Sequence, residues 1–262
     1  MHFLSPSGLR FFSLQRMRVL LQVVCLGFFV LIALTVYGQS EVSKVSSAEN
    51  EIPPSIIHLT KGEREQLRAY LSEAGRLVRT NRSQEILIAL DKALVLAPDY
   101  YAIHNLRGAA FSTMRDFESA RKAFIKAREL EPQAVDVKFN LAEMDFVTGK
   151  YEEALEQYLK LKSDYPKMPN QAYHLLRFKE AICLMKRERD EEAKRVIEEF
   201  TPYEKTPIYH MIHAAEKYNE GDEDSAEGWI RSAQEIYGAQ PVANYLDSLA
   251  EAGWIQSIMQ DR

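Results

Sequence analysis

The sequence has little cysteine and no excess of positive charge. Its 262 residues include only two cysteines, Cys25 and Cys183, and Cys25 lies in an apolar stretch near the amino terminus. The rest of the chain therefore has a single thiol, and no internal disulfide is expected. We interpret Cys183 as a small buried hydrophobic residue. The formal net charge of −5 gives no electrostatic reason to expect a nucleic acid partner.

Motifs of known enzymes are also missing. The sequence contains no Gly-rich phosphate loop, nucleophile elbow or HExxH motif. Only His210 and His213, among six histidines, are close enough to share one face of a helix, and no further ligands complete a metal site. Carboxylates fall in expected turns and on exposed faces, as at 152–153 and 222–224. We therefore predict no catalytic, cofactor-binding or metal-binding residues, and no cofactor.

The alternation of apolar and polar residues that is typical of β-strands is absent. From residue 61 onward, apolar residues follow the spacing of α-helices instead. With 46% hydrophobic and 27% charged residues, the chain can bury a large core. Thr60 and Glu63 form the pattern of a capping box at the first helix start. Two helices are expected at 61–79 and 83–96, with Ser83 capping the second. The fold class predicted is all-α.

An uncharged run at residues 19–37 follows Arg10, Arg16 and Arg18. Nineteen helical residues extend roughly 28 Å, enough to cross a bilayer core. The run predicts either an uncleaved anchor or a signal peptide cleaved near Gly38, and a start at Met17 would give a more ordinary export signal. Both alternatives place the later domain on the exported side, periplasmic or extracellular. The protein would be anchored in the membrane through 19–37, or secreted after cleavage.

Residues 39–60 lack a regular period and contain Pro53-Pro54, which predicts a flexible linker after the leader at 1–38. The domain would then comprise residues 61–262.

Three prolines, Pro98, Pro132 and Pro166, follow one another at intervals of 34 residues. Within this period, small and aromatic residues recur at the positions where two helices would interlock. In the second hairpin these are Gly108, Phe111, Ala120, Phe124 and Ala127, and in the third Leu141, Ala142, Gly149, Ala154, Tyr158 and Leu161. The spacing from Gly149 to Ala154 recurs from Gly221 to Ala226, and glycine allows the left-handed backbone that ends a helix.

These units resemble tetratricopeptide repeats, whose period is 34 residues. The resemblance implies a right-handed superhelical solenoid of helical hairpins. The expected repeats are about 67–100, 101–134, 135–168, 174–206 and 207–240, followed by a capping helix at 241–259. The sequence departs from the family pattern after Pro166, where 167–171 reads as a short insertion and the next unit has no closing proline.

In that family the first helix of each hairpin lines a concave groove that holds peptides or helices. Carried over by position, the groove residues of this chain would be Asn105, Phe139, Glu143, Phe146, Phe178, Ile182, Met185, Met211 and Tyr218. Asn105 and Asn140 have no accompanying lysines, so a clamp for a terminal carboxylate is not expected. The apolar set suits an amphipathic helix or apolar peptide. The alternative is that Phe139, Phe146 and Phe178 are ordinary inter-repeat core.

These observations favour an exported, membrane-tethered scaffold that binds another protein through its groove and has no catalytic activity. Two other classes stay open. One is a structural or self-associating envelope spacer, in which the carboxyl-terminal helix or the groove packs on a second copy. The other is an enzyme with no recognised motif.

Overall fold

A computed structural model describes residues 52–78 and 82–255. Within those residues the chain forms eleven α-helices and no strand. After a short 3₁₀ helix η2 (Pro54–Ile56), the helices are α3 (Lys61–Val78), α4 (Ser83–Leu96), α5 (Tyr101–Thr113), α6 (Phe117–Leu130), α7 (Val135–Val147), α8 (Tyr151–Asp164), α9 (Asn170–Lys186), α10 (Asp190–Ile197), α11 (Ile208–Asn219), α12 (Glu223–Tyr237) and α13 (Ala239–Glu251). The predicted all-α class is confirmed.

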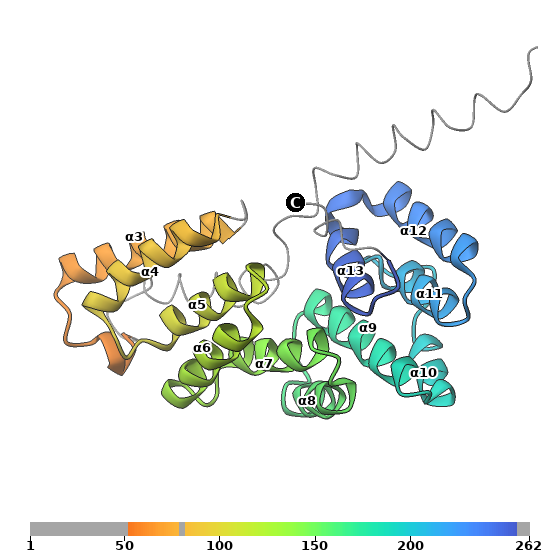
Figure 1. The fold of residues 1–262 in the computed structure, drawn as a ribbon, viewed down its shortest axis with the longest axis horizontal. Helices are drawn as coiled ribbons and strands as arrows, with labels where there is room; N and C mark the ends of the chain where they lie inside the picture. Colours follow the sequence, from red (N-terminus) through yellow and green to blue (C-terminus); the bar gives the residue numbers. More distant parts are fainter. Residues whose placement is uncertain (1–51, 79–81, 256–262) are drawn as a thin grey trace, which may run out of the picture.

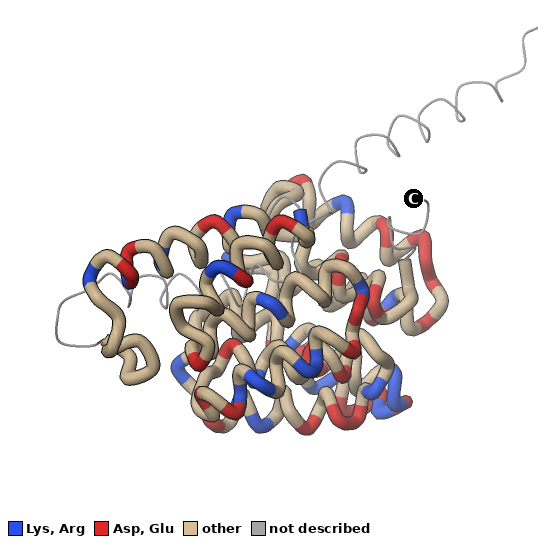
Figure 2. The backbone as a smooth tube through the Cα atoms, turned by 60° about the vertical axis from the view of Figure 1, so that its left-hand side comes forward, with Lys and Arg blue, Asp and Glu red and all other residues tan. Residues whose placement is uncertain are grey.

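The helices pack as consecutive hairpins that together form an arc (Figure 1). Helices α3 and α4 form the first hairpin, and each later pair up to α11 and α12 forms another. In the central part of the arc, α5, α7 and α9 lie on the inner side and α6, α8 and α10 on the outer side. Acidic and basic residues are interspersed along the described helices (Figure 2), as on an ordinary solvated surface. The architecture is that of a helical-hairpin solenoid.

Four hairpins share one turn geometry. The residue two positions after the first helix has a left-handed backbone in each, at Arg115, Gly149, Glu188 and Gly221, with φ of 58°, 75°, 57° and 80°. The following amide then donates to a carbonyl five residues earlier, as in Lys150 N to Asp145 O at 2.8 Å. The expected role of Gly149 and Gly221 is confirmed. The wider spacing from Gly149 to Glu188 contains the expected insertion at 167–171.

Close packing within a hairpin is visible at Gly108. A methyl group added to this residue would lie 2.5 Å from a ring carbon of Phe124. Because real carbon atoms do not approach so closely, only glycine lets α5 and α6 come together here. The prediction that a small residue is needed at this crossing is confirmed.

Helix starts follow the expected capping chemistry in part. The Thr60 amide donates to Glu63 Oε2 at 2.8 Å, and the Glu63 amide donates to Thr60 Oγ1 at 3.3 Å, which confirms the capping box. The prediction that Ser83 caps α4 is wrong. Its hydroxyl lies 2.5 Å from Thr113 Oγ1 instead, so it joins the first two hairpins.

Two segments differ from their expected bounds. Ile56 and Leu59, in the expected linker, are buried against the first hairpin core, so ordered packing begins before residue 61. The capping helix, expected at 241–259, comprises Ala239–Glu251 and ends at a turn in which Gly253 has a φ of 75°. A left-handed residue at this place ends an α-helix. The apolar residues that follow Gly253 had favoured a longer helix in the prediction.

The predicted leader at 1–38, with its apolar run at 19–37, lies outside the described residues. Among residues 52–78 and 82–255, no helix combines the length and apolar character that a membrane span requires.

Candidate protein-binding site

Most residues predicted to line the groove are buried between repeats. Phe146, Phe178, Ile182 and Met211 have no exposed surface, and Asn105, Glu143 and Met185 are at most 5% exposed. Phe139 and Tyr218 are half-buried at the edge of the same core. Phe146 and Phe178 therefore belong to the core between repeats, which was the alternative to a place in the groove. Such side chains cannot touch a partner while this packing is intact.

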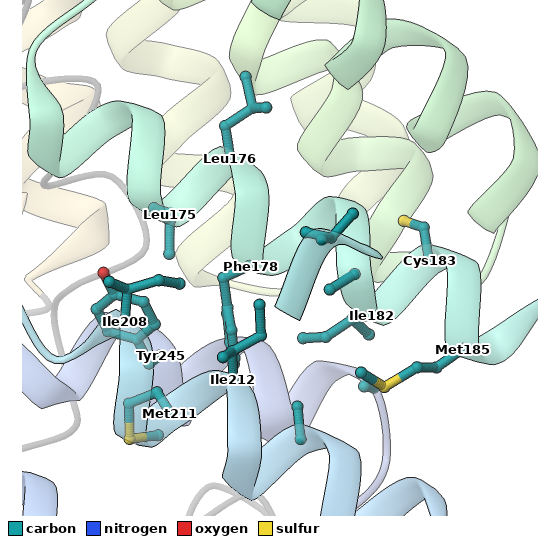
Figure 3. Packing of buried hydrophobic residues seen from close by; sticks show 14 of the residues in the cluster. Leu175, Leu176, Phe178, Ile182, Cys183, Met185, Ile208, Met211, Ile212 and Tyr245 are labelled. Atoms are coloured by element: carbon teal, nitrogen blue, oxygen red, sulfur yellow. The ribbon is translucent and has the colours of Figure 1, made fainter. Parts of the chain in front are cut away.

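Helix α9 organises this region because it is buried on nearly all sides. Every residue from His174 to Met185 is buried, and α9 contacts α8, α10, α11 and α13. Figure 3 shows the two directions: Leu176 and Cys183 point toward the preceding repeats, whereas Phe178 and Ile182 point toward α11 and α13. A helix that is buried on all sides is stable only inside a larger assembly of helices.

Helix α13 covers the inner face of α9. Its apolar residues Val242, Tyr245, Leu246 and Leu249 are all buried and follow the spacing of one helical face. The Tyr245 ring meets the Phe178 ring edge to face, with centroids 5.0 Å apart. The covered surface thus already holds an amphipathic helix, supplied by this chain.

The contact continues beyond the end of α13. Trp254 lies against α9 with its ring centroid 4.2 Å from Lys186 Nζ. The segment 239–255 therefore contacts α9 at Phe178, Lys179 and Lys186.

A buried lysine links α13 to two earlier hairpins. Lys179 Nζ of α9 lies 2.7 Å from Glu143 Oε2 of α7 and 3.3 Å from Glu251 Oε2 of α13. The side chains of Lys179, Glu143 and Glu251 are exposed by only 2%, 7% and 8%. The ammonium also lies 4.2 Å from the centroid of the Phe146 ring, and the Tyr158 hydroxyl donates a hydrogen bond to Glu143. Removing one charge from such a buried set leaves the others uncompensated.

Burial changes the protonation of the acidic residues on α13. It raises the pKa of Glu251 well above the usual value, while the charge of Lys179 opposes that rise. Burial also raises the pKa of Asp247 to about 7, and its Oδ2 atom has no hydrogen-bond partner among the described residues. For Lys179, burial lowers the pKa, but the charges of Glu143 and Glu251 outweigh this and raise it overall. This cluster of acids around one ammonium is enclosed by the helices, as in a structural ion-pair network.

A second buried network surrounds Arg177. Its guanidinium pairs with Glu180 on the same helix and with Glu199 after α10, and Lys162 Nζ of α8 lies 3.0 Å from Glu180 Oε1. Neither network was predicted from the sequence. The charged residues 177, 179 and 180 within an otherwise apolar helix were the available signal.

The two asparagines considered for a carboxylate clamp bind each other. Asn140 Nδ2 donates to Asn105 Oδ1 at 2.9 Å, and Asn105 Nδ2 donates to Asp136 Oδ2 at 2.8 Å. All three side chains are buried. They therefore connect α5 to α7.

The histidine pair lies in an aromatic cluster between α11 and α12. His213 stacks on Trp229 with centroids 5.0 Å apart, and its Nδ1 atom lies 2.9 Å from Glu216 Oε2. His210 meets the edges of Trp229 and Tyr237. Within the part of the chain that the structure describes, no group of three or more His, Cys, Asp and Glu residues is arranged to hold a metal ion.

Comparisons with known proteins give a limited result. No family model matches the sequence, and no solved structure matches it. The chain is similar to human Superkiller complex protein 3, with 29% identity over 100 residues. The match covers 37% of this chain and 6% of the human protein, so it concerns a small part of that relative. Together with the hairpins, this similarity supports a helical-repeat protein.

Proposed function

We propose that this protein is a non-catalytic scaffold that holds another protein through the inner face of its helical arc. The observation that carries the proposal is that the inner face of α9 already holds a helix, α13, against Phe178. Helical-repeat arrays present such inner faces as extended binding surfaces. The name of the similar human protein places that relative in a complex, which is consistent with a protein partner here.

The first part of the arc offers an inner face with accessible side chains. Ala102 and Ser112 of α5 and Phe139 of α7 are half-buried. A partner segment on this face would find small residues on α5 beside an aromatic residue on α7. Small residues let a backbone approach closely, and a partly exposed ring gives an apolar anchor. We propose this surface as the place where a partner helix or apolar peptide binds.

The test is a substitution that obstructs this face at a residue that is only partly buried. Ala102→Arg adds bulk and charge on α5, so a captured partner should be lost or bind at least tenfold more weakly. Glu129→Arg, on an exposed position of α6, is the control and should retain capture. Partners would be captured from extract, identified by mass spectrometry and then measured as purified proteins. Equal capture by both folded variants would contradict the assignment of this face.

We also propose that the domain is exported and tethered through residues 19–37, on the ground of the apolar run and its flanking arginines. Amino-terminal sequencing of the protein isolated from membrane and soluble fractions tests this. A tethered protein keeps the run and stays with the membrane fraction. A secreted protein begins close to residue 39. Recovery of the uncleaved chain from the soluble fraction contradicts both forms of the proposal.

A further inference from the structure

We infer that the surface beneath α13 is a helix-binding site, which the chain's own carboxyl-terminal helix occupies and from which a partner helix displaces it. The partner would be an amphipathic helix with apolar residues at positions i, i+3, i+4 and i+7 and a carboxylate at i+9. This inference rests on the proposed function and specifies the partner. It assigns α13 the role of an autoinhibitory segment.

The apolar part of the pattern comes from α13. Val242, Tyr245, Leu246 and Leu249 occupy these four positions and lie in one core cluster with Phe178, Ile182 and Met211. Their apolar neighbours in this cluster belong mainly to α9 and α11, which contact each other directly, and α13 also contacts α12. The receiving surface is therefore built by packing that does not need α13 in place.

The carboxylate in the pattern comes from the contact of Glu251 with Lys179, which lies at the last residue of α13 and on the other side of the helix from Val242. Lys179 lies between Glu143, which belongs to α7, and Glu251, which α13 supplies. When α13 leaves, Lys179 keeps Glu143 as its partner and loses Glu251. An incoming helix with an acidic residue at i+9 restores the second contact, and a basic residue there would face a buried ammonium. Charge complementarity thus selects among amphipathic helices.

The polar side of α13 makes its own docking weaker than its apolar side alone would give. The buried Ser248 hydroxyl donates to the Asn244 carbonyl at 3.0 Å, whereas Asp247 is enclosed with one oxygen that makes no hydrogen bond among the described residues. Burying polar groups without full pairing opposes the gain from apolar contact. A partner helix with the same apolar face but without the Asp247 carboxyl would bind the same surface more tightly.

The connection to α12 allows α13 to move by itself. Only Gly238 separates the two helices, with φ of 81° and ψ of 167°, a conformation that residues with side chains rarely adopt. Rotation about this one residue would swing α13 away while α11 and α12 stay paired. Hinges of this kind are a few residues at the end of an element.

Hydrogen exchange on the full chain tests whether α13 opens by itself. We expect amides of 239–252 to exchange at least tenfold faster than those of α9 and α11, because α13 detaches without global unfolding. Exchange of α13 only at the rate of α9 would overturn the inference, since the helix would then be a fixed part of the core.

Peptide binding tests the specificity of the site. The probe is a labelled peptide with the sequence of residues 239–255, measured by fluorescence anisotropy. In the full chain, Glu251→Lys places two ammonium groups together and should release α13, so the peptide should bind at least tenfold more tightly than to wild type. Glu235→Lys, an exposed change of the same charge on α12, should bind it as weakly as wild type does. A peptide with lysine at the position of Glu251 should bind the Glu251→Lys chain at least tenfold more weakly than the native peptide.

Equal peptide binding by the Glu251→Lys and Glu235→Lys chains, with helical circular dichroism unchanged, would overturn the inference. If Glu251→Lys unfolds the protein, the exchange experiment on the wild-type chain decides. Neither experiment uses Ala102 or a captured partner. Loss of the autoinhibitory site is therefore distinguishable from failure of the proposed scaffold function, which Ala102→Arg tests.

Discussion

Gly108 is the residue at which the packing of a hairpin is most sensitive to size. Gly108→Ala would place a methyl group 2.5 Å from the Phe124 ring. We expect the free energy of unfolding to fall by about 1–3 kcal/mol, as for overpacking in other cores. Urea denaturation measures this. Gly75→Ala is the matched control, since a methyl group there meets no atom within 4 Å, and it should stabilise α3 by about 0.5–1 kcal/mol. Equal changes in the free energy of unfolding for the two substitutions would contradict the conclusion that Gly108 is needed for the close approach of α5 and α6.

Asp247 makes stability depend on pH in a definite direction. Its pKa is about 7 in the folded protein and ordinarily 3.8, so the folded state holds the proton more tightly than the unfolded state. The free energy of unfolding should therefore be highest near pH 4 and decrease as pH rises to about 7. The decrease would be at most about 4 kcal/mol. Glu251 contributes in the same direction, because burial also raises its pKa.

Chemical denaturation at pH 5, 6, 7 and 8 checks this prediction. Asp247→Asn keeps the size of the side chain and removes its titration, so the decrease between pH 5 and 8 should become smaller. Lys179 of α9 and Glu251 of α13 are the charged groups near this residue, and both stay unchanged in the variant. An identical pH profile for the variant and the wild type would show that Asp247 titrates normally.

At the level of elements, the hairpin turns show one backbone geometry reached by two kinds of residue. Gly149 and Gly221 adopt the left-handed conformation freely, whereas Arg115 and Glu188 adopt it with a side chain. In each turn the amide after the left-handed residue donates a hydrogen bond to the carbonyl five residues earlier. This hydrogen bond requires the left-handed geometry whichever residue occupies the position. The repeat is thus more regular in structure than in sequence.

This difference gives a prediction for single turns. A left-handed residue with a side chain costs about 1–2 kcal/mol, and glycine loses about 0.5–1 kcal/mol through the entropy of the unfolded chain. Glu188 is exposed, so Glu188→Gly should raise the free energy of unfolding by up to about 1 kcal/mol. Gly221→Ala should lower it by a similar amount. Thermal unfolding of the two variants checks both signs. A loss of stability in Glu188→Gly would show that its side chain contributes a contact of its own.

Over the whole molecule, the core has two parts that meet at α7. The first contains buried residues from Ile56 to Met144, and the second contains those from Ala142 to Ala252. Leu141 belongs to the first part and Phe146 to the second. In an array whose repeats contact mainly their neighbours, such parts can open separately.

Leu90→Ala tests this division, because Leu90 is fully buried in the first part of the core. The cavity should cost about 2–5 kcal/mol. Hydrogen exchange should accelerate in α3 to α6 and change much less in α9 to α13. Ile182→Ala, in the second part, should give the opposite distribution. Uniform acceleration by both variants would show that the arc unfolds as one cooperative unit.

The repeats and their turns could be predicted from the sequence because they depend on local rules. The 34-residue proline period, the glycines at 149 and 221 and the small residue at 108 act within one hairpin, so their spacing suffices to place them. Ser83 is the instructive exception: its type favours a cap, but a tertiary contact with Thr113 takes its hydroxyl.

The candidate site depended on the tertiary structure. Phe178, Ile182 and Met211 were predicted to line an open groove, whereas the structure buries all three in one core cluster with residues of α13. The partners of Lys179 come from α7 and α13, and Glu251 lies 72 residues further along the chain. Which helices meet at such distances depends on the curvature of the arc. Curvature arises from small rotations between successive repeats, and those rotations follow from packing that no local spacing records.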